Sequence, residues 1–197
     1  MRFAAIYDFD NSINQTNYYS FEDGFSEQEL GWIDNLKELY PFQTATTVSD
    51  TSTVNDEIRK SKIKWLHHDD KSAWVYDKIR DFSIQANNSI WKFNLHTIID
   101  SIQYTEYYAD GGHYGWHTDI GPGSISHRKI SVTIQLSDTD EYEGGDFELW
   151  SGGGFMTMPK KKGSVILFPS FTMHRVTPVT KGVRRSLVLW VGGEAYK

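Results

Sequence analysis

The stretch Tyr108-Ala-Asp-Gly-Gly-His-Tyr-Gly-Trp-His-Thr-Asp119 carries most of the information in this chain. An Asp-Gly-Gly turn separates two short runs that are rich in aromatic side chains, which indicates a pair of β-strands. In the second run, His117 and Asp119 stand two positions apart. Residues two apart on an extended strand point to the same side, so an imidazole nitrogen and a carboxylate oxygen can reach one cation. The pair predicts part of a site for Fe(II), Mn(II) or Zn(II).

The same strand-and-turn pattern continues on both sides of this stretch. Short β-type runs alternate there with turns that contain Gly, Pro and Asp. Eight such runs favour a sandwich, jelly roll or barrel over βαβ units. They are Thr97–Tyr108, His113–His117, Lys129–Leu136, Asp146–Trp150, Phe155–Met158, Ser164–Phe168, Met173–Val176 and Arg185–Val191.

The first half of the chain carries the expected helices. Ser26 followed by Glu29 is typical of a capping box, and apolar residues then recur at helical spacing, which predicts a helix over Ser26–Tyr40. A ragged apolar stripe predicts a second helix over about Lys71–Ile90. The polar stretch Gln43–Asn55 between them is typical of a loop.

Composition limits the function classes. The chain has 197 residues, a formal charge of −6 and no cysteine, so we expect one domain without disulfides or thiolate chemistry. The acidic balance argues against general binding of a nucleic-acid backbone. No apolar run approaches the roughly 20 residues of a membrane span, and the first ten residues do not form a signal-peptide pattern. We therefore expect no membrane association and a cytoplasmic protein, in the host cytoplasm if a phage encodes it.

A third metal ligand must come from elsewhere in the chain, and His174 is the best candidate because it follows an apolar strand-like run. Two histidines and one carboxylate on one face of a metal form the facial triad of non-haem Fe(II) oxygenases. The His-x-Asp spacing also occurs twice in His67-His68-Asp69-Asp70, but no glycine turn or aromatic strand surrounds it. We interpret that second stretch as a solvated loop.

Ten residues after His174 comes Arg184, and Ser186 shares its strand face by the period of two. A guanidinium binds a carboxylate through two parallel hydrogen bonds, and a hydroxyl can add a third. The pair therefore predicts an anchor for the distal carboxylate of a dicarboxylic keto acid. Arg185 alternates to the other side of the strand.

Three quoted segments carry a resemblance to a known family: YADGGHYGWHTDIG, EGGDFELW and KKGSVILFPSFTMHRVTPVTKGVRRSLVLW. In their order and spacing, from about Tyr104 to Trp190, the chain resembles the Fe(II)- and 2-oxoglutarate-dependent dioxygenases of the prolyl 4-hydroxylase superfamily. Within this superfamily it looks close to the PKHD-type hydroxylases of bacteria and phages. Residues 1–90 resemble the family only loosely.

The resemblance implies a mainly β chain whose double-stranded β-helix, a cupin-like jelly roll, is buttressed by N-terminal helices. It implies one dioxygenase domain over 1–197, in which 1–90 is a helical support and 91–197 the catalytic core. Position and composition alone, rather than the resemblance, lead to the hypothesis that residues 43–55 and the strand near Trp65 form a substrate lid.

The resemblance also implies the site. His117, Asp119 and His174 would bind Fe(II), and Arg184, with Ser186, would pair with 2-oxoglutarate; O2 is the further cosubstrate, and ascorbate is the expected reductant. The family places a tyrosine nine or ten residues before the first histidine. Tyr108 fits this spacing better than Tyr107, and Gln135 falls where some relatives have a second tyrosine.

The implied reaction is hydroxylation of an aliphatic C–H bond, most simply in a prolyl residue of a peptide or protein. Three alternatives stay open: a hydroxylase of a free amino acid or other small molecule, a metal-binding jelly-roll module without catalysis, and a cupin-like metalloenzyme that uses no keto acid. The sequence does not determine the oligomeric state.

Overall fold

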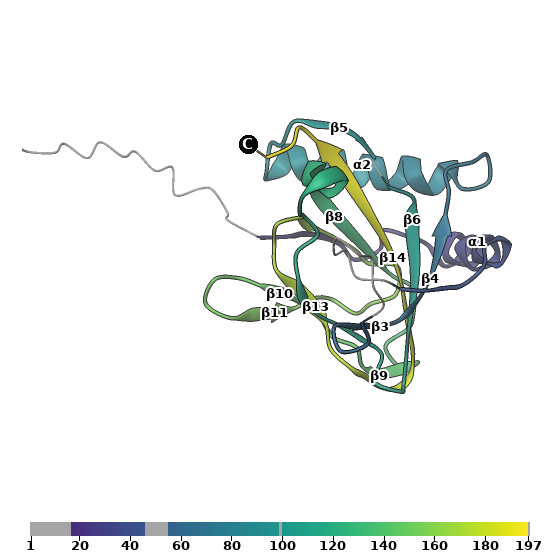
Figure 1. Cartoon of the computed structure of the whole chain (residues 1–197). Coiled ribbons are helices and arrows are strands. Elements are labelled where there is room, and N and C mark those ends of the chain that lie inside the picture. Colours follow the sequence, from purple (N-terminus) through teal and green to yellow (C-terminus); the bar gives the residue numbers. More distant parts are fainter. Residues whose placement is uncertain (1–16, 46–54, 99, 197) are drawn as a thin grey trace, which may run out of the picture.

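The computed structural model describes residues 17–45, 55–98 and 100–196, which form two antiparallel sheets and two α-helices (Figure 1). The larger sheet has the strand order β1-β12-β8-β14-β6-β4-β2, and β5 and β9 also pair with β14. The smaller sheet has the order β11-β10-β13-β7-β3. The strands of the larger sheet are β1 (Tyr19–Phe21), β2 (Gln43–Thr44), β4 (Lys62–Leu66), β5 (Leu95–Ile98), β6 (Ile102–Tyr108), β8 (Arg128–Gln135), β9 (Tyr142–Gly144), β12 (Val165–Pro169) and β14 (Val179–Gly193). Those of the smaller sheet are β3 (Arg59–Lys60), β7 (His113–His117), β10 (Phe147–Trp150), β11 (Phe155–Thr157) and β13 (His174–Val176).

Both predicted helices are present. In α1 (Glu27–Leu36), Ser26 caps the helix and the Glu29 side chain accepts a hydrogen bond from the Ser26 N–H, so the predicted capping box is confirmed. A short 3₁₀ turn, η1 (Lys37–Leu39), continues α1, and a second one, η2 (Gly123–His127), precedes β8. The second helix is α2 (Ala73–Ser89), which runs across the larger sheet in Figure 1.

The helices cover one face of the larger sheet because alternate strand residues point to that face. Buried leucine, isoleucine and valine side chains of α1 and α2 pack there against Ile130, Val132 and Ile134 of β8 and Leu187 and Leu189 of β14. The residues between them in the chain point to the opposite face, toward the smaller sheet. Burial of both faces explains why every residue of β8 is buried.

A second apolar cluster lies between the two sheets and joins them into a sandwich. Its buried members are Tyr107, Tyr142, Phe147, Leu149, Met158, Ile166, Phe168, Val176 and Val179. The prediction of a mainly β jelly roll buttressed by helices is confirmed, since the strands, their antiparallel pairing and the helical cover are all present.

Some elements differ from the prediction. The predicted strand Thr97–Tyr108 is two strands, β5 and β6, and the last strand, β14, begins at Val179 rather than at Arg185. Strands β1 to β4 lie within residues 1–90 and join both sheets, so this part of the chain is more than a helical support. Three of these strands have only two or three residues, which is too short to produce an alternating pattern. Most of the possible lid, residues 46–54, lies outside the described residues.

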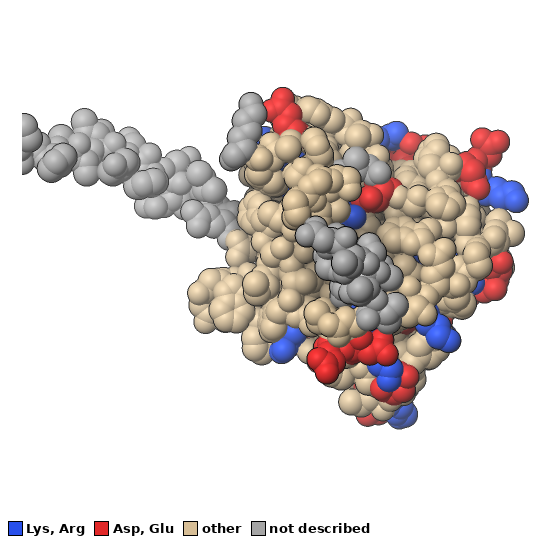
Figure 2. All heavy atoms as spheres, viewed as in Figure 1, with Lys and Arg blue, Asp and Glu red and all other residues tan. Residues whose placement is uncertain are grey.

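The described helices include none that is long and apolar enough to cross a membrane. On the face drawn in Figure 2, basic side chains lie among acidic ones rather than in one basic patch.

Candidate active site

The two sheets bring together the three side chains that the sequence singled out as metal ligands. His117 ends β7 and His174 begins β13, and the two residues are directly opposite partners across these antiparallel strands. Asp119 follows β7, and its backbone N–H donates to the Ser170 carbonyl at 2.9 Å. The Asp119 carboxylate lies 3.8 Å from His117 Nε2 and 3.4 Å from His174 Nε2. One possible ligand atom from each residue lies within 4.8 Å of the others, and the described residues contain no other such group of three.

Both imidazoles are held with Nε2 free to bind. The Nδ1–H of His117 donates to the Gly115 carbonyl at 2.8 Å, and that of His174 donates to the Thr172 carbonyl at 2.9 Å. Such a bond fixes the tautomer and leaves a lone pair on Nε2. Burial, followed by the neighbouring His174, lowers the pKa of His117 to about 3. The His117 ring is therefore neutral at neutral pH, as a metal ligand must be.

Asp119 is buried, but it keeps its negative charge. Burial alone would raise the pKa of its carboxyl group, and the two neighbouring histidines oppose this effect. The Ser131 hydroxyl also donates to Asp119 Oδ2 at 2.6 Å, and the pKa lies below its usual value as a result. Two imidazoles and a carboxylate form a donor set that suits Fe(II).

The three side chains open into a cavity of about 700 Å³ between the sheets, which is within the usual range for a small-molecule site. One wall is the face of the larger sheet that points away from the helices. Directly opposite residues of an antiparallel pair share a face, so the strand register sets this wall. It includes Ile63, Trp65, Gln103, Tyr107, Thr133, Arg184, Ser186, Val188 and Trp190.

Arg184 lines this cavity and is only 1% exposed, which makes it the largest fully buried side chain described. Its Nη2 donates to Gln135 Oε1 at 3.0 Å and its Nη1 to Ser186 Oγ at 3.5 Å, while its Nε has no partner. Among the described residues it forms no salt bridge. A buried guanidinium with only neutral partners is costly unless a ligand brings a negative charge. This observation fits a keto acid with a distal carboxylate.

The structure also locates the secondary candidates. Ser186 lines the cavity beside Arg184. Gln135 is fully buried and is not among the lining residues; its contact is with the guanidinium.

The preference for Tyr108 is corrected. Tyr107 lies directly opposite Arg184 across β6 and β14 and lines the cavity, with the guanidinium 5.5 Å from its ring centre. Tyr108 points to the other face of the sheet, where its hydroxyl donates to Glu106. The reason is the period of two: adjacent strand residues cannot share a face.

Several residues that line the cavity were not predicted as site residues, and four of them contact one another or a metal-binding residue. Tyr114 stacks on His117, with ring centres 3.5 Å apart. The guanidinium of Arg59, in β3, lies 4.6 Å from the ring centre of Tyr114. Arg128 pairs with Asp100 and packs on Trp190. Arg59 lies in a polar segment without a motif, so the sequence offered no signal for its place in the cavity.

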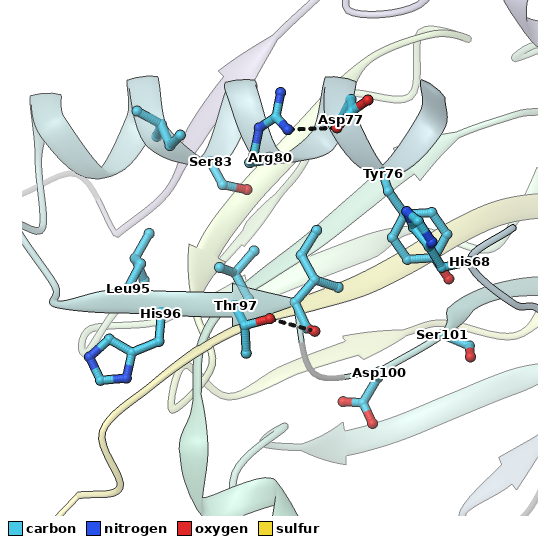
Figure 3. A pocket seen from close by; sticks show the side chains of 13 residues that line it. His68, Tyr76, Asp77, Arg80, Ser83, Leu95, His96, Thr97, Asp100 and Ser101 are labelled. Atoms are coloured by element: carbon cyan, nitrogen blue, oxygen red, sulfur yellow. Dashed lines mark hydrogen bonds and ion pairs between the residues drawn. The ribbon is translucent and has the colours of Figure 1, made fainter. Parts of the chain in front are cut away.

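A second cavity of about 630 Å³ lies between α2 and β5 (Figure 3). Arg80 points toward Asp77 on the same helix and forms an ion pair with it at 2.6 Å. His96 and Asp100 lie well apart in the view, and the described residues contain no metal-competent group of three here. The chemistry-bearing groups are therefore concentrated in the first cavity.

Residues 102–192 match the family model described as the 2OG-Fe(II) oxygenase superfamily. Among curated proteins, a PKHD-type hydroxylase of Teredinibacter turnerae is 40% identical over 89 residues, which are 43% of this chain and 39% of that protein. One of Acidovorax ebreus is 39% identical over 90 residues, or 43% and 40% of the two chains. The matched segment thus spans about two fifths of these relatives.

Solved structures show the same fold over most of the chain. A prolyl hydroxylase of Trichoplax adhaerens, in complex with a hypoxia-inducible-factor peptide, has a TM-score of 0.76 at 16% identity and covers 92% of this chain and 86% of its own. A Pseudomonas putida prolyl-4-hydroxylase has a TM-score of 0.69 at 16% identity, with 92% and 95% covered. At such identities the likeness concerns the fold. The sequence matches show that the segment 102–192 belongs to the 2OG-Fe(II) oxygenase superfamily.

Proposed function

We propose that this chain is an Fe(II)- and 2-oxoglutarate-dependent dioxygenase that hydroxylates an aliphatic C–H bond of a prolyl residue in a peptide or protein. One observation carries the proposal: a two-histidine, one-carboxylate group and a buried guanidinium without an acidic partner among the described residues line the same cavity. The names of the relatives and of the structural neighbours support the choice of substrate class.

The donor set would hold the metal. His117, Asp119 and His174 each place one ligand atom within 4.8 Å of the other two. The Asp119–histidine separations of 3.4 and 3.8 Å approach the roughly 3 Å between adjacent ligands around a cation with bonds of about 2.1 Å. The carbonyl partners of both histidines and the Ser131 hydroxyl keep these atoms in place before the metal arrives. Three protein ligands leave positions open for a bidentate keto acid and O2.

The guanidinium would hold the distal carboxylate of 2-oxoglutarate. Arg184 is oriented by Gln135 from β8 and by Ser186 from its own strand, and Ser186 can donate to the same carboxylate. Tyr107 covers one side of the guanidinium with its ring. When bound, Fe(II) and 2-oxoglutarate supply the oxidative chemistry, in which O2 and the keto acid yield succinate and CO2 and one oxygen atom enters the substrate C–H bond.

The surrounding side chains exclude water from this end of the cavity. Phe147 and Phe168 contact the His174 ring, with ring centres 5.8 and 4.8 Å away, and Tyr114 covers His117. Burial raises the pKa of Tyr114 to about 12, so this phenol stays neutral beside the metal-binding group. A dry pocket protects an oxidising centre from side reactions.

The test is release of succinate from 2-oxoglutarate in the presence of Fe(II) and ascorbate, measured against proline-containing peptides, free proline and other free amino acids. We expect a peptide to stimulate succinate release and to gain one oxygen atom by mass spectrometry. Stimulation by a free amino acid alone would make the chain a small-molecule hydroxylase. Absence of both 2-oxoglutarate binding and succinate release would identify a non-catalytic module.

A further inference from the structure

Three arginines line the active-site cavity. One of them has an acidic partner in the protein, and a second is assigned to the carboxylate of the cosubstrate. Arg128 forms ion pairs with Asp100, with nitrogen–oxygen distances of 2.8 and 2.9 Å. Arg184 is assigned to 2-oxoglutarate by the proposed function. Arg59 lines the same cavity and forms no salt bridge with any described residue.

Arg59 is held firmly in place by neutral groups. Its Nη2 donates to Gln103 Oε1 at 2.6 Å and its Nε to Ser61 Oγ at 3.0 Å. The guanidinium lies 4.6 Å from the ring centre of Tyr114. The side chain is only 8% exposed, so its charge has lost most of its contact with water without gaining a counter-ion.

The charges in the loaded site leave Arg59 uncompensated. The two positive charges of Fe(II) and the one of Arg184 cancel the carboxylate of Asp119 and the two carboxylates of 2-oxoglutarate. Arg128 and Asp100 also cancel. The positive charge of Arg59 is then the only one along the cavity wall, among the described lining residues, that faces the remaining space without an anion.

The position of Arg59 places this charge on the route of a substrate. Its neighbour Ile58 also lines the cavity and is 43% exposed, so β3 lies at the cavity mouth. Arg59 stacks on Tyr114, which stacks on His117, and the distances of 4.6 and 3.5 Å put the guanidinium within about 8 Å of the His117 ring. An extended peptide covers that distance in about two residues.

We propose that Arg59 binds a carboxylate of the substrate that lies within about two residues of the oxidised carbon. The carboxylate belongs either to an acidic side chain of a peptide or to the terminal carboxyl group of a short substrate. This inference rests on the proposed function. Arg59 is therefore a specificity-determining residue, and the acidic chain recognises an acidic substrate through one buried cation.

Binding can be measured without turnover, in enzyme loaded with Mn(II) and the inert analogue N-oxalylglycine. The probes are short proline peptides in matched pairs: capped peptides with Glu or Gln beside the proline, and peptides ending in prolyl carboxylate or prolyl amide. Ligand-observed NMR titration gives each dissociation constant. We expect an acidic probe to bind about tenfold to a hundredfold more tightly than its neutral partner, the range for a charged hydrogen bond. The pair that shows the difference identifies the source of the carboxylate.

Arg59→Gln is expected to abolish this preference, and Arg59→Lys to retain part of it. Lys60→Gln is the matched control, because Lys60 is the next residue of β3 and pairs with Asp110 outside the cavity. Equal binding of acidic and neutral probes to the wild-type enzyme would overturn the inference, and so would an equal loss of both probes in Arg59→Gln. Measuring 2-oxoglutarate binding with Mn(II), and substrate-free succinate release with Fe(II), on separate portions of the same enzyme preparations without N-oxalylglycine separates the two proposals. If the wild-type enzyme binds 2-oxoglutarate and releases succinate but binds acidic and neutral probes equally, only the role of Arg59 is refuted.

Discussion

Replacing Arg184 by leucine should separate cosubstrate binding from folding. The guanidinium is buried, and among the described residues it hydrogen-bonds only to Gln135 and Ser186, so its charge is unpaired until a carboxylate arrives. Loss of a charge-assisted bidentate contact costs on the order of 2–4 kcal/mol, which weakens 2-oxoglutarate binding about 30- to 900-fold.

The same substitution should change the stability of the cofactor-free protein little. Removing an unpaired buried charge stabilises the fold, while leaving Gln135 Oε1 without a donor costs about 1–3 kcal/mol, so the two effects largely offset each other. We expect the free energy of unfolding of Arg184→Leu to stay within about 2 kcal/mol of the wild type.

Two measurements decide the matter: the dissociation constant of 2-oxoglutarate with Mn(II) in the absence of O2, and the urea midpoint with and without 2-oxoglutarate. Arg185→Leu is the matched control, because this neighbouring side chain contacts Glu106 and Glu141 on the other face of β14. Arg184→Lys keeps the positive charge but not the planar guanidinium that can form two parallel hydrogen bonds. Its affinity for 2-oxoglutarate should fall between those of Arg184→Leu and Arg185→Leu. Wild-type affinity in Arg184→Leu would refute the assignment of the anchor.

Three further predictions concern the metal group, the pH dependence of stability and a glycine within β14. His174→Ala should lose Mn(II) binding in calorimetry, and succinate release with it, while retaining the wild-type circular dichroism spectrum; retained binding would remove His174 from the metal group. Burial alone would raise the pKa of Glu106, but hydrogen bonds from two tyrosine hydroxyls outweigh it and lower the pKa below 4.5. Ionised Glu106 therefore stabilises the fold above pH 4.5, and this stabilisation is lost as the pH falls through the lowered pKa of Glu106. Glu106→Gln should for this reason reduce the drop in the urea midpoint that acid causes. An unchanged drop in this variant would contradict the prediction. Gly182 has φ +69°, and a Cβ there would overlap the Glu141 carbonyl, so Gly182→Ala should lower the free energy of unfolding by at least about 2 kcal/mol, whereas Gly153→Ala, with open space around it, should not.

Elements that depend on patterns within a few residues of one another were predicted correctly from the sequence. The capping box at Ser26 and the apolar spacing behind it produce α1, because both depend on contacts three or four positions apart. The strand over His113–His117 agrees with its prediction at both ends. The short strands β1 to β3 were missed, since two or three residues carry no periodicity and depend on their partner strands for hydrogen bonds.

For the site, the sequence by itself determined which side chains could share a face: His117 with Asp119, and Arg184 with Ser186, because the period of two is a property of any extended backbone. Only the tertiary structure decided which of the two faces of each strand lines the cavity. The pairing of β6 with β14 puts Tyr107, not Tyr108, opposite Arg184, and the pairing of β3 with β7 brings Arg59 over Tyr114. Register between distant strands arises from the packing of the whole sheet, so no local run of residues encodes it.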